Sequence, residues 1–186
     1  MRYKIGYKEE KRNQLLKITG QVAKKAGFQN TGIDDFMKAA GVTSGAFYSH
    51  FSSKHELFKA LIHNELEQSI QMWQTNPFDD PEQWIDFELE RYLSLSHVEK
   101  SEYGCLLPAL ATEVARSDEE IKQHYQAELL RGHQIFVKYL GSEKQAWAVM
   151  CQLVGAILMA RSVLDENIKL IIIESSKNMI KNYLSY

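Results

Sequence analysis

Apolar residues recur at intervals of three and four along most of the chain, the spacing at which side chains share one face of an α-helix. In the N-terminal part this pattern predicts helices over residues 8–26, 33–40, 44–51 and 53–73. Gly27 and Gly41 follow the first two segments and are good helix stops. The fourth segment opens on a Ser-x-x-Glu pattern at Ser53, which is typical of a capped helix N-terminus.

The same periodicity continues after one clear break, the sequence TNPFDDP at residues 75–81. It predicts helices over residues 82–97, 106–116, 118–140, 143–164 and 166–183. Pro108 falls in the first turn of its helix, where its missing N–H costs little. Strand-like alternation bounded by Asn-Gly or Asp-Gly turns is absent from the sequence. The pattern therefore predicts an all-α fold.

Charge divides the chain into two unequal parts, although the formal net charge is only −2. Residues 1–60 carry eleven Lys and Arg against five acidic residues, a balance of +6. Residues 61–186 carry eleven against nineteen, a balance of −8. This split predicts that the smaller part meets a polyanion, although two unevenly charged solvated surfaces would produce a similar split.

Sequence features that would indicate a membrane protein, a metal centre or an enzyme are missing. The N-terminus lacks the apolar core of a signal peptide, and the most apolar windows, residues 149–160 and 170–173, are too short to span a bilayer. Cys105 and Cys151 have neither metal-ligand nor redox spacing. The sequence holds no phosphate-binding loop, nucleophile elbow or HExxH pattern. We predict a cytoplasmic, non-enzymatic protein without a metal, a cofactor or a membrane partner.

The helices predicted over residues 33–40 and 44–51 are separated only by Gly41, Val42 and Thr43, which is the arrangement of a helix-turn-helix. Glycine tolerates the positive φ of a tight turn, Val42 is expected to pack beneath the helix crossing, and Thr43 is a suitable N-cap. The second of these helices carries small and polar residues and no acid. Such a helix suits the major groove, where each base pair presents a distinct pattern of donors and acceptors.

Residues 31–57, TGIDDFMKAAGVTSGAFYSHFSSKHEL, resemble the DNA-binding signature of tetracycline-repressor-like (TetR/AcrR) regulators. The shared features are the Thr before the first helix, the A-G-V-T turn, the F-Y-x-H-F helix and the following S-K-x-E-L. The resemblance implies an N-terminal three-helix helix-turn-helix domain, residues 1–53, and a C-terminal helical domain for effector binding and dimerisation, residues 54–186. It also implies a homodimeric transcriptional regulator, a repressor that a small, largely hydrophobic or aromatic effector releases from operator double-stranded DNA.

Seven residues are assigned to DNA through this resemblance. Phosphate contacts are implied for Thr31, Tyr48, His50 and Lys54, and contacts with base edges or nearby phosphates for Thr43, Ser44 and Gly45. Ser44 stands where many members carry Lys or Arg, which moves the expected readout toward other groove contacts or DNA shape. Additional backbone contacts are predicted for the N-terminal cations Arg2, Lys4, Lys8, Lys11 and Arg12, with a solvated tail as the alternative for the first four residues.

The C-terminal part supplies the predicted dimer interface and effector pocket. Apolar stripes in the last two helices predict a four-helix interface that includes Val149, Leu153, Ala156, Ile157, Ala160, Ile172 and Ile180, and closure of the monomer core is the alternative. The predicted effector pocket draws on Trp73, Trp84, Phe87, Tyr92, Tyr103, Cys105, Leu106, Tyr125 and Trp147. The helix that follows Ser53 joins both parts and is the expected lever between ligand and DNA.

Three alternatives stay open at this level. Cys105, expected near a helix N-terminus, would sense oxidants if its pKa were lowered, whereas a buried thiol would only fill space. An enzyme would pair Cys105 with His97, His124 or His133. A dimeric scaffold would keep the fold and lose DNA binding.

Overall fold

The structure, a computed structural model, describes residues 6–184, and helices account for all of its regular secondary structure over that range. The helices are α1 (Tyr7–Ala26), α2 (Ile33–Ala39), α3 (Ser44–Phe47), α4 (Lys54–Gln74), α5 (Pro81–Tyr92), α6 (Leu95–Glu99), the 3₁₀ turn η1 (Ser101–Tyr103), α7 (Leu107–Ala115), α8 (Glu119–Leu140), α9 (Glu143–Arg161) and α10 (Glu166–Leu184). The all-α prediction is confirmed.

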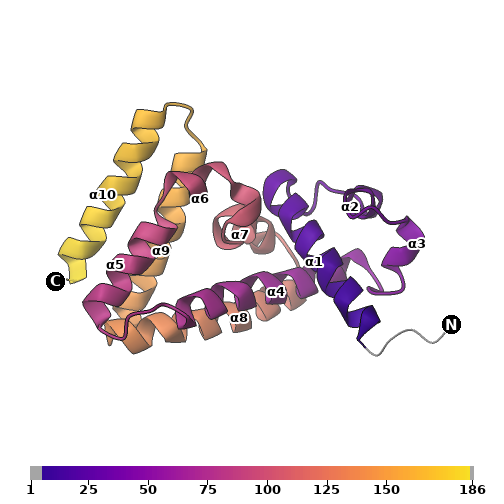
Figure 1. Cartoon of the computed structure of the whole chain (residues 1–186), viewed down its shortest axis with the longest axis horizontal. Coiled ribbons are helices and arrows are strands. Elements are labelled where there is room, and N and C mark those ends of the chain that lie inside the picture. Colours follow the sequence, from indigo (N-terminus) through magenta and orange to yellow (C-terminus); the bar gives the residue numbers. More distant parts are fainter. Residues whose placement is uncertain (1–5, 185–186) are drawn as a thin grey trace.

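Helices α1, α2 and α3 form a unit at one end of the molecule, and α5, α9 and α10 lie at the other end (Figure 1). The long helices α4 and α8 pack along each other and connect the two ends. Ser53 accepts a hydrogen bond from the Glu56 amide, so the predicted cap of α4 is present. Asp118 and Ser142 cap α8 and α9 in the same way.

The core of the N-terminal unit does not end at residue 53. Phe28, Phe36 and Phe47 are buried together with Phe58 of α4 and Leu110 of α7, which lie in the same cluster. The Phe28 and Phe58 rings stack with their centroids 4.2 Å apart. The first turns of α4 therefore belong to the core of both parts of the chain.

A second core fills the C-terminal part around Trp84. Its indole is fully buried, stacks on Tyr139 at 4.4 Å and meets Phe136 edge-on at 5.2 Å. Trp73 meets Phe136 from α4, also edge-on at 5.2 Å. Burying aromatic side chains on this scale contributes several kcal/mol of stability in typical cores, roughly 3–5 kcal/mol for each residue cut back to Ala. Among the helices of residues 6–184, none combines the length and apolarity that crossing a bilayer requires.

The structure differs from the sequence predictions at residues 82–97 and at Val42. The helix predicted over residues 82–97 is two helices, because Leu93 leaves helical geometry with φ −86° and ψ 73° and Ser94 caps α6. Val42 is 39% exposed instead of lying beneath the crossing, and Phe36 and Phe47 are the buried aromatic side chains of α2 and α3. Both differences come from tertiary packing, which the periodicity of a single segment does not encode.

Candidate DNA-binding surface and ligand cavity

The turn between α2 and α3 has the geometry that its sequence predicts. Gly41 has a φ of +69°, which an L-residue with a Cβ rarely adopts. Thr43 precedes α3 in an extended conformation, and its hydroxyl makes no capping bond, contrary to the prediction. The amides at the start of α3 are thus left without a side-chain cap, and Thr43 and Gly45 are exposed. Exposed helix N-terminal amides are suitable partners for a phosphate.

Helix α3 is anchored on one side and free on the other. Phe47 is fully buried, and the next residue, Tyr48, is 64% exposed, with the two rings edge-on at 5.1 Å. Phe51 is buried beneath the Arg12 guanidinium, which lies 4.9 Å from the ring centroid. The α3 surface is therefore a rigid platform that presents Tyr48 to the outside next to a cation of α1.

His50 lies at the inner edge of this surface. Its Nδ1 is buried without a hydrogen-bond partner. Burial lowers the pKa of His50, and the positive charges of Lys8 and Arg12 lower it further. At neutral pH the imidazole is therefore uncharged, and the positive potential here comes from α1. Arg2 and Lys4, the other predicted N-terminal cations, lie outside the described residues.

Three predicted DNA residues also support the local structure. The Lys54 ammonium donates to the Gln29 carbonyl at 3.0 Å and lies over the Phe28 ring. The Thr31 hydroxyl is buried and donates to the carbonyl of Gly27 at 2.7 Å, so its side chain braces the loop before α2. Ser44 donates to Asp34 and so joins the start of α3 to α2.

A cavity of about 620 Å³ lies between α1, α4, α5, α6 and η1. Four of the predicted pocket residues line it: Trp73, Tyr92, Tyr103 and Cys105. The other cavity-lining side chains are mostly polar: Lys24, Glu65, Gln68, Ser69, Gln71, Thr75, Arg91, Ser94, Ser96, His97 and Lys100, with Met72 among them. The cavity is thus more polar and more basic than the aromatic pocket that the sequence predicts.

The remaining pocket predictions fall elsewhere. Trp84 is in the C-terminal core, and Phe87 pairs with Phe78 at the protein surface. Trp147 stacks on His133 at 4.1 Å. Tyr125 packs against the N-terminal core, where burial raises its pKa to about 12. Leu106, also fully buried, belongs to that core, so helical periodicity located aromatic side chains without separating core from cavity.

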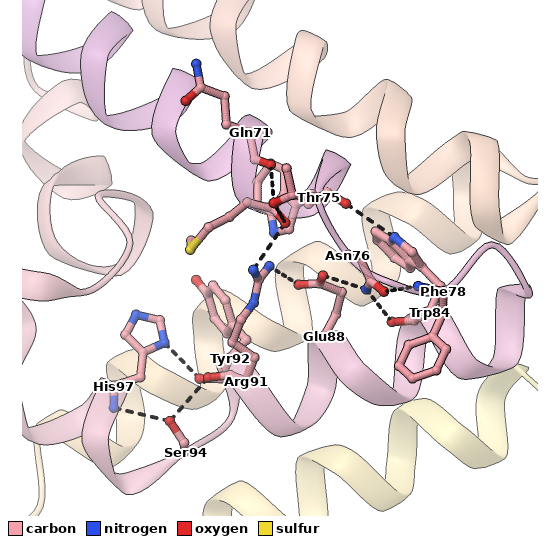
Figure 2. A network of polar contacts seen from close by, with 12 residues as sticks. Gln71, Thr75, Asn76, Phe78, Trp84, Glu88, Arg91, Tyr92, Ser94 and His97 are labelled. Carbon is pink, nitrogen blue, oxygen red and sulfur yellow. Dashed lines mark hydrogen bonds and ion pairs between the residues drawn. The ribbon is translucent and has the colours of Figure 1, made fainter.

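One wall of the cavity is organised by a hydrogen-bond network around Arg91 (Figure 2). Arg91 donates to the Met72 carbonyl at 3.2 Å and pairs with the buried carboxylate of Glu88. Asn76 also donates to Glu88, at 2.8 Å. Burial raises the pKa of Glu88, and the charge of Arg91 opposes this. The network fixes the C-terminal end of α4 to α5, so this wall is rigid.

His97 joins α5, α6 and the segment before α7. Its Nδ1 lies 2.8 Å from the Tyr92 carbonyl, and its Nε2 accepts a hydrogen bond from the Cys105 amide at 3.0 Å. These partners require the neutral tautomer with the proton on Nδ1. Burial lowers the pKa of His97 to about 4. This histidine is therefore a structural group and has no free nitrogen for acid–base chemistry.

Cys105 does not have the environment expected of an oxidant sensor. The thiol is buried, and burial raises its pKa, whereas a sensor needs a lowered one. Its sulfur accepts a weak hydrogen bond from the Leu107 amide at 3.4 Å. Desolvation outweighs the favourable position before α7, so the structure favours the space-filling alternative.

His55, Glu56 and Glu120 place potential metal-ligand atoms within 4.8 Å of one another. The Lys59 ammonium already pairs with Glu120 at 2.7 Å and with Glu56 at 3.4 Å. His55 in turn contacts Asp118 at 3.1 Å. These groups are accounted for as ion pairs that join the starts of α4 and α8.

The helix-turn-helix and the rest of the chain are similar to known proteins. The model of "Bacterial regulatory proteins, tetR family" matches residues 15–61, which are α1 to the first turns of α4. A helix-turn-helix regulator from the lacX 3′ region of Lactococcus lactis is 22% identical over 91% of both proteins. The DNA-binding region of the chain, residues 15–61, is thus that of the TetR family of transcriptional regulators, which are not enzymes.

The likeness is strongest in the DNA-binding region. The transcriptional activator FasR of Mycolicibacterium smegmatis is 33% identical over 63 residues, which are 34% of this chain and only 29% of FasR. The crystal structure of reduced Escherichia coli NemR has a TM-score of 0.79 and 20% identity, covering 93% of this chain and 96% of NemR. The TetR fold thus extends over nearly the whole chain, whereas sequence similarity is concentrated in the helix-turn-helix.

Two contacts tie the helix-turn-helix to the C-terminal part of the chain. Lys24 of α1 donates to Glu65 of α4 at 2.6 Å and to the carbonyl of Gly104 at 2.9 Å. Glu113 of α7 accepts hydrogen bonds from the amides of residues 28 and 29, at 3.0 and 2.7 Å. Sequence reasoning missed both, because the partners are 41 to 85 residues apart and each residue alone reads as a solvated charge.

Gly20 makes the first of these contacts possible. A Cβ at position 20 would lie 2.4 Å from Oε1 of Glu65, so only glycine lets the carboxylate approach α1 this closely. The side chains of Lys24 and Glu65 are 6% and 7% exposed. A glycine inside a helix, facing an acid that pairs with a lysine one turn later, is the signal that the sequence offered.

The residues predicted for dimerisation are largely buried within the single chain. Val149, Leu153, Ala156, Ile157, Ala160 and Ile180 belong to the core between α9, α10 and their neighbours, and Ile172 is partly buried against it. The monomer-core alternative thus accounts for these side chains. Other apolar residues of the same two helices are exposed: Leu158, Met159, Ile168, Leu170, Ile171, Met179 and Tyr183.

Proposed function

We propose that the chain is a homodimeric repressor that binds operator double-stranded DNA in the cytoplasm and leaves it when a small effector occupies the cavity. The observation that carries the proposal is the α3 surface, on which Thr43, Gly45 and Tyr48 are exposed together near Arg12 of α1. Phosphate groups on DNA favour such a combination of amides, hydroxyls and cations. The effector acts through α4, which contributes to the N-terminal core and to the cavity wall.

A second copy of the chain is proposed to cover the exposed apolar face of α9 and α10. On α10 this face includes Ile168, Ile171 and Met179, and on α9 it includes Leu158 and Met159. Apolar residues at these spacings on two adjacent helices form a stripe that is unfavourable in water. A two-fold axis through the stripe would give a four-helix interface and two reading heads for two half-sites.

An acidic residue placed in this face is expected to separate the dimer. Ile171 is 63% exposed, so Ile171→Glu should leave the monomer fold intact but weaken dimerisation at least about tenfold, since burying an unpaired carboxylate is costly. Sedimentation equilibrium would show a shift from twice 21.5 kDa toward 21.5 kDa. Leu130→Glu, on the exposed face of α8, is the matched control and should stay dimeric. Equal masses for both variants would contradict this interface.

DNA binding is tested by fluorescence anisotropy with the DNA that flanks the protein's own coding sequence, over a salt series. Tyr48→Phe removes one hydroxyl and should weaken binding to a palindromic segment about fivefold, the effect of roughly 1 kcal/mol. Lys54→Ala should weaken it about tenfold and reduce the salt slope by about one. Both effects follow from losing a phosphate partner, and Lys54→Ala also frees the Gln29 loop.

The control for DNA binding is Tyr103→Phe, which removes the hydroxyl of another exposed tyrosine, at the cavity rim. Its affinity for DNA without effector should equal that of the wild type. Weak, sequence-indifferent binding that is the same in all four proteins would contradict the proposed repressor and favour a dimeric scaffold.

A further inference from the structure

We propose that the effector is a small organic anion whose acidic group binds at the Lys24 end of the cavity. This inference rests on the proposed function, since it names the chemical class that the cavity accepts. This effector differs in chemical class from the hydrophobic one that the sequence predicts. The group that binds its acid is the Lys24 ammonium, which belongs to α1, a helix of the DNA-binding part. The ligand would thus touch the reading head directly.

The Lys24 ammonium is held in position with one donor to spare. It donates to Oε2 of Glu65 at 2.6 Å and to the Gly104 carbonyl at 2.9 Å, and its side chain lines the cavity. An ammonium has three N–H donors, so these two bonds leave one for a ligand. Because Lys24 is 6% exposed, a hydrogen bond to an incoming carboxylate is formed in a poorly hydrated site, where charge-assisted bonds are strong.

Further polar groups line the cavity besides Lys24. They include Ser69, whose hydroxyl already donates to the Glu65 carbonyl at 3.1 Å, Tyr92 and Cys105. The Tyr92 hydroxyl oxygen is buried and has no hydrogen-bond partner of normal geometry. An unsatisfied buried hydroxyl costs free energy, and a ligand oxygen would satisfy it.

The charges around the cavity favour an anion. Lys24, Arg91 and Lys100 line it against one carboxylate, Glu65, and Glu88 lies behind Arg91 as its ion-pair partner. Counting these five groups, the balance is +1, and Lys100 contributes the unpaired charge. Lys100 is exposed and therefore solvated without a ligand, but the positive balance attracts a monoanion more strongly than a neutral molecule.

The dimensions of the cavity indicate the size of the effector beyond its acidic group. Glu65 and Trp73 are the first and last residues of α4 that line the cavity, and their separation of eight positions corresponds to about 12 Å of helix. Trp73 and Met72, toward the other end of α4, supply apolar surface away from Lys24. A monocarboxylate with an aryl or alkyl chain of this length fits both parts of the lining.

The geometry also connects ligand binding to the operator. A ligand carboxylate on the third N–H shares the positive charge of Lys24 with Glu65, so it weakens the ion pair that fixes α1 to the C-terminal part. The position of α1 determines where α3 lies, because both helices share one core. A ligand that binds the displaced state better shifts the population away from the DNA-bound state.

The test measures binding of 4-phenylbutyrate and octanoate against their primary amides, by calorimetry and by the shift in Tm, on the full-length protein. Each carboxylate should bind at least about tenfold more tightly than its amide, the effect of one charge-assisted hydrogen bond in a buried site. Lys24→Gln should abolish this preference. Lys100→Gln and Tyr92→Phe should reduce it several-fold, and they keep the Lys24–Glu65 pair intact if Lys24→Gln fails to fold. Lys144→Gln, on the exposed start of α9, should bind like the wild type.

Three outcomes would overturn the inference. The amides bind as tightly as the acids, neither carboxylate binds, or the preference for the acid over the amide is unchanged in Lys100→Gln and Tyr92→Phe. Operator affinity is measured on the same samples by anisotropy. Absence of operator binding contradicts the proposed function, whereas intact operator binding without acid preference contradicts only the anionic effector.

Discussion

Replacing Glu65 by alanine is expected to lower the free energy of unfolding by about 3–5 kcal/mol. The substitution removes the partner of Lys24 and leaves an ammonium that is 6% exposed in a site that water hardly reaches. The remaining acceptor, the Gly104 carbonyl at 2.9 Å, does not neutralise the charge. Removing one partner of a buried ion pair therefore costs more free energy than the intact pair contributes, because the remaining charge is desolvated without a counter-charge.

The double variant Lys24→Met/Glu65→Leu distinguishes this explanation from a general loss of packing. It removes both charges and keeps similar volumes, so it should recover most of the lost stability, as apolar replacements of buried ion pairs often do. Lys181→Met, which breaks the exposed pair with Asp86, is the control and should cost less than about 1 kcal/mol. Chemical denaturation of all three variants gives the comparison. A double variant as unstable as Glu65→Ala would show that the charge imbalance is not the cause.

The same pair joins the helix-turn-helix to the rest of the chain, and in the proposed function these two parts move relative to each other when the effector binds. Glu113 adds a second connection, since its carboxylate accepts the amides of Phe28 and Gln29 in the loop after α1. These two charged contacts fix the helix-turn-helix unit, α1 to α3, in one orientation without a large apolar interface. They are suited to a switch, since a ligand can replace one acceptor by another at small net cost.

The helices and the DNA-binding motif were predictable because their signals are local. Apolar periodicity located the long helices to within a few residues, and Gly41 and Ser53 marked a turn and a cap that the structure has. The one long helix wrongly predicted, over residues 82–97, breaks at Leu93 without a glycine or proline to announce it. Its break follows from Ser94 capping α6 and from the packing of α6 against α9.

The cavity and the contacts between the two parts were not predictable in the same way. Trp84 and Trp73 are both large aromatics on helices, yet one is enclosed by Phe136 and Tyr139 and the other borders the cavity. Which of them meets a ligand depends on how α4, α5 and α8 cross, and that is a property of the whole fold. Lys24 and Glu65 illustrate the same limit. Charged residues are assigned to the surface when only the sequence pattern is considered, so a buried ion pair is missed.

Acidification is expected to destabilise the protein through His97. In the folded state the Nε2 of this ring accepts the Cys105 amide, so a proton on Nε2 would remove a hydrogen bond and place two donors face to face. Burial accordingly lowers the pKa of His97 from 6.5 to about 4. Between these two values the unfolded chain binds a proton at His97 and the folded chain does not. Stability therefore falls as the pH decreases from 6.5 toward 4, by roughly 3 kcal/mol for the full shift.

The measurement is the free energy of unfolding by urea at several pH values from 7.5 to 4 in wild type and in His97→Gln. Glutamine can still accept a hydrogen bond but does not titrate, so the variant should be less stable than wild type at neutral pH and lose less stability on acidification. His55→Gln, on the partly exposed start of α4, is the matched control and should keep the acid dependence of the wild type. If His97→Gln and wild type lose stability in parallel between pH 6.5 and 4, the acid sensitivity lies in the carboxylates and not in the histidine that connects α5 to the cavity wall.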